Sequence, residues 1–283
     1  MTKFLTAILA AFLLALGVSA QTEQIVWEKD FKKAQALARE SGRPLLLDFT
    51  AAWCKPCKAM DERFWVLPEV VNMTKPFIAV KVNFDNEKGL VGKYNVSAIP
   101  FVIFADPLGN LITFRRGFGE KNAGELNQIL KEMPKDFSAL KKYYEAVELK
   151  KNDGLALLQI ADSYRASKML TLSNDFYEKA LKTPEIQGDA EKRERIAATL
   201  GLNAYTVKDY RQANKYLEDY LKDFPAGKYR EVSFTVLAIG NANLDKMKIA
   251  DKYLELLKTE FPASKNTAAA VKAVEEAKNK RDK

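Results

Sequence analysis

The chain has 283 residues, 47% hydrophobic and 29% charged, a balance typical of about two globular domains rather than of disorder. Its net charge of +8 comes from basic residues that alternate with acidic ones, so we interpret it as a solvated surface and expect no nucleic-acid partner. The absence of histidine excludes Ser-His-Asp and Cys-His catalysis. Zinc held by the two cysteines would need two carboxylates as well, so we expect neither a metal nor a cofactor.

Residues 1–20 have the pattern of a secretory signal peptide. Lys3 precedes an apolar run over 4–18, and small residues stand before the expected cleavage point. The run is short for a membrane span, although an uncleaved anchor is the alternative. We therefore expect a soluble exported protein, in the periplasm or another extracytoplasmic space, where disulfides persist.

Residues 21–134 mix the periods of strands and helices and predict a layered α/β domain. The turn at 106–110 lies between two short strands, which indicates a hairpin. The expected strands are 45–50, 77–84, 101–105 and 111–114, and the expected helices are 31–40, from the cysteines to about 65, 87–94 and 125–131.

Residues 135–283 lack strand patterns and predict amphipathic helices. Segments 215–226 and 252–263 are similar and end in Phe-Pro pairs 37 residues apart, and 176–182 is a weaker copy. This period is close to that of helix-turn-helix repeats, and each unit resembles the second half of a tetratricopeptide repeat. An irregular helical bundle is the alternative.

Cys54 and Cys57 stand between a predicted buried strand and a helix. At the first turn of a helix, unpaired N–H groups and the helix dipole favour a thiolate. We therefore expect Cys54 to be the exposed nucleophile, with Lys55 as a neighbouring cation, and Cys57 to resolve the mixed disulfide. Pro56 suits the first helical turn. The alternative, a purely structural disulfide, would close a very small loop and so constrain the unfolded chain little.

Asp48 interrupts the apolar run of 45–50. A charged acid buried there without a partner loses its hydration, which costs several kcal/mol, on the order of the effective penalty for a buried ion. Such acids therefore usually have a shifted pKa or a functional role. We expect Asp48 to take the proton from Cys57, directly or through water. The alternative is an acid satisfied by Lys81 on a neighbouring strand, and the two interpretations are compatible.

Three segments together resemble the thioredoxin superfamily: LDFTAAWCKPCK at 47–58, KVNFD at 81–85 and SAIPF at 97–101, with Gly117 before the last helix. The resemblance implies a central mixed sheet flanked by helices, a redox disulfide between Cys54 and Cys57 beside Trp53, and an acid at Asp48 that assists the buried cysteine. It also implies a cis peptide at Pro100 against the redox pair, which leaves the Ile99 backbone free to pair with an extended substrate.

Segment 64–81 more closely resembles the C-terminal periplasmic domain of the transmembrane reductase DsbD and its soluble relatives. Those domains carry an acid where Asp61 stands, and the resemblance implies a membrane thiol reductase as electron donor. Lys55 departs from the glycine of ordinary thioredoxins, which leaves the direction of electron flow open.

These observations predict a thioredoxin-like α/β domain followed by an all-α, tetratricopeptide-like repeat domain. We expect a thiol–disulfide oxidoreductase, as a reductase or isomerase of exported clients that carry disulfides or thiols, because Pro56 resembles the reducing members. The alternative is an adaptor that binds a protein or peptide on its helical repeats, with the redox domain auxiliary or a redox sensor.

Overall fold

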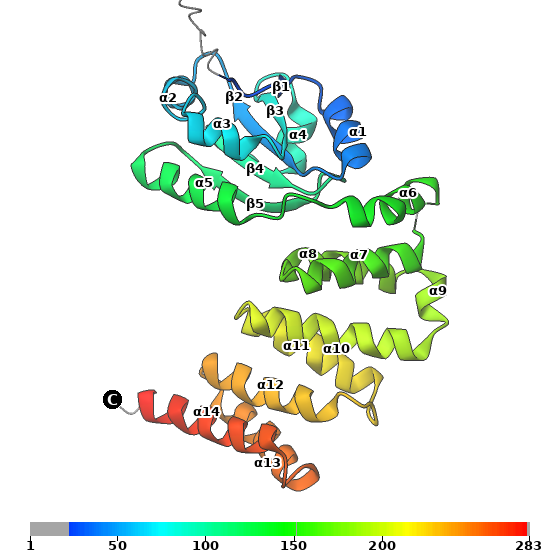
Figure 1. Ribbon diagram of the computed structural model, residues 1–283. Helices are drawn as coiled ribbons and strands as arrows, with labels where there is room; N and C mark the ends of the chain where they lie inside the picture. The colour runs from blue at the N-terminus through cyan, green and yellow to red at the C-terminus, as the bar shows by residue number, and fades with distance from the viewer. Residues whose placement is uncertain (1–22, 151, 282–283) are drawn as a thin grey trace, which may run out of the picture.

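The computed structural model describes residues 23–150 and 152–281 (Figure 1). The predicted signal peptide, residues 1–20, lies outside the described residues. Within the described part, no helix combines the length and the apolar character needed to cross a bilayer. An α/β unit comes first in the chain, and a stack of helices follows it (Figure 1).

The α/β unit is built on one five-stranded mixed sheet with the order β1-β3-β2-β4-β5. Neighbours β1, β3 and β2 are parallel, whereas β2–β4 and β4–β5 are antiparallel. The strands are β1 (Trp27–Glu28), β2 (Leu45–Thr50), β3 (Ile78–Asn83), β4 (Phe101–Ala105) and β5 (Leu111–Arg116). The four predicted strands are present, while β1 has two residues and is too short to show a period.

Alternation along β2 divides the core into two layers. Leu45, Leu47 and Phe49 pack with α1 and the end of α4, whereas Leu46 packs with α2, α3 and α5. Because successive side chains point to opposite faces, Asp48 shares the face of Leu46 and lies beneath α2. The helices are α1 (Phe31–Ser41), α2 (Lys55–Arg63), α3 (Pro68–Thr74), α4 (Lys88–Lys93) and α5 (Glu120–Glu132).

Two helices differ from the expected bounds. The helix expected to reach about residue 65 ends at Arg63, and α3, which we did not predict, starts at Pro68. A proline suits the first position of a helix, so it starts a new one here rather than continuing the old one. Helix α5 begins at Glu120, five residues before the predicted start at 125. The prediction placed the start too late because the first turn of the helix is polar and shows no apolar period.

The register of β2 separates two functional ends of the sheet. Phe49, at the end of β2 that leads to the cysteines, pairs with Phe101 at the start of β4. Leu45, at the other end, pairs with Ala105, which precedes the β4–β5 turn. A six-residue strand spans about 17–20 Å. The redox turn and the hairpin turn therefore lie at opposite ends of the sheet.

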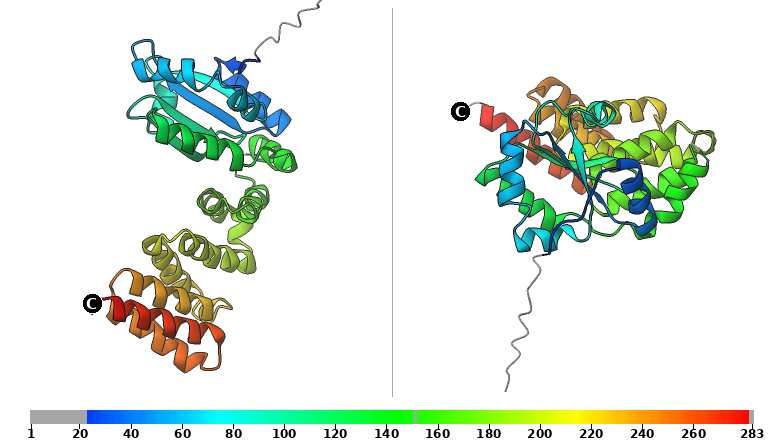
Figure 2. Two further views of the ribbon diagram at one scale, coloured as in Figure 1. Left: turned by 60° about the vertical axis from the view of Figure 1, so that its left-hand side comes forward. Right: turned by 90° about the horizontal axis from the view of Figure 1, so that it is seen from above.

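The C-terminal half is all-helical, as predicted. Consecutive helices pack as pairs, α7 with α8, α10 with α11 and α12 with α13, and the pairs stack away from the sheet (Figure 2). The long helix α14 packs mainly against α12. Whether they are tetratricopeptide repeats stays a prediction. The elements are η1 (Ser138–Leu140), α6 (Lys141–Leu149), α7 (Gly154–Ala166), α8 (Leu170–Leu181), α9 (Pro184–Gln187), α10 (Ala190–Thr206), α11 (Tyr210–Asp223), α12 (Arg230–Asn243), α13 (Met247–Glu260) and α14 (Lys265–Arg281).

The two similar sequence segments end their helices in the same way. Helix α11 ends at Asp223 and α13 at Glu260, in each case just before a Phe-Pro pair. The residue before proline is disfavoured in the helical region, so the chain must turn there. The repeated Phe-Pro pairs therefore mark equivalent corners of the stack.

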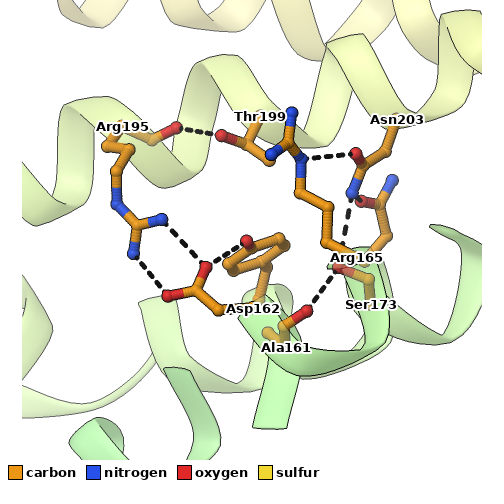
Figure 3. Close-up of polar contacts among 9 residues, drawn as sticks. Ala161, Asp162, Arg165, Ser173, Arg195, Thr199 and Asn203 are labelled. Atoms are coloured by element: carbon orange, nitrogen blue, oxygen red, sulfur yellow. Dashed lines mark hydrogen bonds and ion pairs between the residues drawn. The ribbon is translucent and has the colours of Figure 1, made fainter. Parts of the chain in front are cut away.

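Polar contacts fix α10 against the α7–α8 pair (Figure 3). Arg195 of α10 donates to both carboxylate oxygens of Asp162 of α7, at 2.9 and 3.1 Å, and Tyr177 of α8 donates to the same carboxylate. Further along α10, Asn203 accepts from Arg165 Nε at 3.1 Å. A forked arginine–carboxylate pair has a defined geometry, so it sets the register between neighbouring helix pairs.

The helical half is joined to the hairpin end of the sheet by a buried hydrogen bond. Tyr164 of α7 donates to Asp106 in the β4–β5 turn at 2.6 Å. Asp106 is fully buried and also accepts from the backbone and side-chain nitrogens of Asn110. Burial raises the pKa of Asp106, while the bonds from Tyr164 and Asn110 act in the opposite direction. The turn that closes the hairpin is therefore also the anchor of the helices.

Gly42 forms a second contact at this seam. It ends α1 with a left-handed backbone, φ 71°, and its carbonyl accepts from Phe137 N at 2.7 Å. A Cβ built on Gly42 would lie 2.5 Å from Ser138 N. Only glycine fits both the conformation and the close approach of the linking segment.

Gly42→Ala is expected to lower the free energy of unfolding by more than about 1–2 kcal/mol, the cost of the left-handed backbone alone. The matched control is Gly89→Ala in α4, whose Cβ would meet nothing within 4 Å. It should be neutral or stabilising by up to about 1 kcal/mol, because alanine favours helix. Urea unfolding followed by circular dichroism measures both. Equal losses in the two variants would contradict a specific constraint at Gly42.

Candidate active site

The cysteine pair lies at the N-terminus of α2. Cys54 is the N-cap residue, and its Sγ accepts a hydrogen bond from the backbone N–H of Cys57 at 3.2 Å. The two cysteines form a disulfide, with Cα atoms 5.3 Å apart. Lys55 and Pro56 occupy the first turn and are exposed. The four residues of the predicted redox turn thus lie together where the helix presents its unpaired N–H groups.

The expectation that Cys54 is exposed is wrong for the disulfide form. Cys54 and Cys57 are only 2% and 3% exposed. Ala51 packs with the pair, and half-buried Phe84 and Ile99 cover it. The disulfide also bonds the sulfur of Cys54 to that of Cys57. A position at the start of a helix therefore does not make Cys54 exposed in this form.

Asp48 and Asp61 share one lysine between β2, β3 and α2. Asp48 on β2 pairs in register with Lys81 on β3, and the Lys81 ammonium donates to Asp48 Oδ2 at 2.5 Å. The same ammonium also contacts Asp61 of α2. The Asp48 side chain is 3% exposed, that of Lys81 21% and that of Asp61 43%. One cation therefore bridges a buried and a surface carboxylate.

The surroundings of Asp48 favour its neutral form. Burial raises its pKa above the usual range, since the charged form loses its water. The charge and hydrogen bond of Lys81 lower the pKa, the charge of Asp61 raises it, and the hydrogen bond of Trp65 lowers it. The net direction is upward, so Asp48 exchanges its proton closer to neutral pH than an exposed aspartate does.

Trp53 lies on the surface beside the redox turn and is 63% exposed. Its indole N–H donates to Asp85 Oδ2 at 2.9 Å, and its ring meets Phe84 edge-on with centroids 6.4 Å apart. Sequence reasoning did not assign Asp85 and Phe84 to the site. Both belong to the segment at 81–85 that carries the family resemblance, so this motif could have predicted that they lie at the site.

The loop before β4 forms the other wall of the site. The Ile99–Pro100 peptide is cis, Pro100 is buried and Ile99 is half-buried against the cysteines. The carbonyl of Pro100 accepts from Gly117 N at 2.8 Å, which ties this loop to the end of β5. Loops distant in sequence therefore meet at one end of the sheet.

Trp65 is a further residue of the site that sequence reasoning missed as such. It follows α2, is 4% exposed, and its indole N–H donates to Asp48 Oδ2 at 3.0 Å. An apolar run contains no pattern that predicts the direction of an indole N–H. Across residues 23–150 and 152–281, no group of three or more Cys, Asp or Glu is arranged to hold a metal ion.

The sequence matches known proteins over the α/β unit. A profile of the family described as Thioredoxin-like matches residues 26–107. Over 140 residues the chain is 31% identical to the thiol:disulfide interchange protein TxlA homolog of Synechocystis sp., covering 44% of this chain and 73% of that protein. It is 33% identical over 78 residues to a Thioredoxin H-type of Oryza sativa subsp. indica, covering 26% of this chain and 59% of that protein. It is 29% identical over 105 residues to the thiol:disulfide interchange protein DsbD of Photorhabdus laumondii, covering 36% of this chain and 18% of that protein.

The architecture and the redox turn define a protein with a thioredoxin fold and an appended helical region, which confirms the predicted fold class. The chain belongs to the thioredoxin-like family of thiol–disulfide oxidoreductases. It spans 59% of the rice thioredoxin and 18% of DsbD, so clients, partners and cellular location do not follow from these matches.

Asp48→Asn is expected to stabilise the fold at neutral pH. Because the folded-state pKa of Asp48 is raised, wild-type stability is lost as pH rises through that pKa, and asparagine removes this loss. Lys81 keeps Asp61 as its partner, so the change leaves no unpaired ammonium, and the gain should grow as pH rises through the raised pKa. Urea unfolding from pH 4 to 9 measures it. The two proteins should converge at the acid end, and a constant difference across the range would contradict the assignment.

Proposed function

We propose that the protein is a disulfide reductase of exported proteins, with Cys54 as the attacking thiolate and Cys57 as the resolving thiol. One observation carries the proposal: a redox disulfide caps the N-terminus of α2, and the strand that leads to it carries a buried carboxylate, Asp48, whose pKa is raised. An isomerase also forms a mixed disulfide first, and it differs from a reductase in which thiol then resolves it. In a reductase this is Cys57, and in an isomerase it is another thiol of the client.

The helix start favours Cys54 as the nucleophile. Its Sγ already accepts the N–H of Cys57, and the positive end of the helix dipole stabilises a thiolate there. Exposed Lys55 adds a cation beside it. Cys57 lies one turn into the helix, where a thiol has less electrostatic support and needs a base.

The reaction consists of two exchange steps. The Cys54 thiolate attacks a client disulfide, forms a mixed disulfide and releases one client sulfur as thiolate. Cys57 then gives its proton to Asp48, directly or through water, attacks the Cys54 sulfur and releases the second client sulfur. The client gains two electrons, and the protein is left with the Cys54–Cys57 disulfide. A dithiol donor must return two electrons for another turnover.

The predicted signal sequence and the thiol:disulfide interchange relatives support an extracytoplasmic location. Disulfides persist there, so a reductase needs electrons from across the membrane. We therefore assign the donor to a membrane thiol reductase. Pro56 within the redox turn supports the reducing direction through the family resemblance.

The helical half is assigned to a protein or peptide partner. A cavity of about 450 Å³ lies between α8, α10 and α11 and supports this assignment. Three carboxylates and one cation line it: Glu178, Asp219, Asp223 and Lys182. The excess of negative charge favours a segment with basic side chains. This contact would raise the local concentration of a client.

The reducing assignment predicts that the protein reduces insulin disulfides and that Cys54→Ser abolishes this activity. Cys57→Ser, the matched variant, should keep the first exchange and accumulate a mixed disulfide, because the resolving sulfur is gone. Turbidity of precipitating insulin and mass spectrometry of trapped adducts measure the two effects.

Equilibration with glutathione should give a potential nearer the roughly −270 mV of thioredoxin than the roughly −120 mV of DsbA. A value near that of DsbA would overturn the reducing direction. If Cys54→Ser left every activity and interaction unchanged, the protein would instead be an adaptor whose redox domain is auxiliary.

A further inference from the structure

We propose that Trp65 is a positioning residue for the resolving step: its indole N–H, together with Lys81, occupies Oδ2 of Asp48 and leaves Oδ1 as the oxygen that accepts the Cys57 proton. This inference deepens the proposed function and rests on it. It assigns a distinct role to each oxygen of one carboxylate.

The two oxygens of Asp48 have different surroundings. Oδ2 accepts from Lys81 Nζ at 2.5 Å and from Trp65 Nε1 at 3.0 Å. Oδ1 is buried and has no hydrogen-bond partner among the described residues. An oxygen that already accepts from a cation and an N–H is the weaker base of the two. The proton therefore goes to Oδ1.

Packing fixes the direction of the Trp65 indole. Its ring meets Phe64 edge-on at 4.9 Å and Trp27 of β1 edge-on at 5.4 Å, and the side chain is 4% exposed. A buried ring held on two sides cannot turn its N–H away from Asp48 without disturbing this core. The indole thus acts as a fixed donor, whereas the Lys81 ammonium is divided between two carboxylates.

This arrangement has a chemical consequence for resolution. The S–H bond of Cys57 breaks and an O–H bond forms at Oδ1. The thiolate then attacks the Cys54 sulfur of the mixed disulfide, the Cys54–client S–S bond breaks, and the client sulfur leaves as thiolate. The charged and titratable groups near Asp48 are Lys81 of β3, Asp61 of α2 and the cysteine pair. Trp65 adds a donor that carries no charge, so it stabilises the carboxylate without itself titrating over the working range.

The test is Trp65→Phe, which keeps an aromatic ring and removes the N–H. A hydrogen bond to a charged group corresponds to about one pKa unit or more, so the Asp48 pKa should rise by about that amount. The carboxyl carbon of Asp48 in 13C-labelled protein reports this value by NMR titration. The pH at which insulin reduction reaches half its maximum should rise by the same amount.

Trp27→Phe is the matched control. Trp27 contacts Trp65, and the Lys81 ammonium lies 4.4 Å from its ring centroid, a face that phenylalanine also offers. This variant should leave the Asp48 pKa unchanged. Replacing Trp65 by benzothienylalanine, which has sulfur in place of the N–H, keeps the bicyclic shape if phenylalanine disturbs folding, and it should reproduce the shift.

Equal shifts in Trp65→Phe and Trp27→Phe would overturn the inference, since packing alone would then explain them. An unchanged Asp48 pKa in the benzothienylalanine protein would also overturn it. If the wild type showed no reductase activity, the proposed function would fail, while the NMR titration would still decide whether Trp65 controls Asp48.

Discussion

The pairing of β2 with both β3 and β4 is the constraint on which the rest of the molecule depends. Its parallel register with β3 sets Asp48 opposite Lys81, and its antiparallel register with β4 brings the redox turn to the cis-Pro100 loop. A slip of one residue would turn Asp48 towards α1 and away from Lys81 and Trp65. The site is thus a consequence of strand register.

Electrostatics explain why this acid is tolerated in the core. Burying a neutral polar group without a partner costs about 2–7 kcal/mol, and burying a charged carboxylate costs more. Lys81 and Trp65 offset part of that cost at Oδ2, and Asp61 prevents Lys81 from neutralising Asp48 completely. The result is a group whose pKa is raised but whose charged form still has donors, which is what a reversible proton acceptor requires.

Much of the α/β unit could be predicted from sequence because its information is local. Apolar runs identified the four longer strands, and the cysteine spacing placed the redox turn at a helix start. Contacts between residues distant in the sequence could not be predicted in this way. The Trp65 indole reaches Asp48 over 17 positions, and Tyr164 reaches Asp106 over 58. The burial of Cys54 was also missed, since it depends on Phe84 and Ile99 from other loops.

The opposite ends of β2 constrain how the two halves can act on one client. The helices attach at the end marked by Asp106 and Gly42, while Cys54 lies at the other end. The strand between them spans about 17–20 Å. An extended chain covers about 3.3–3.6 Å per residue, so a client held beside the hairpin end needs about six extended residues to reach the redox turn. Contacts made at the helical half and exchange at Cys54 are therefore separated by at least the length of β2.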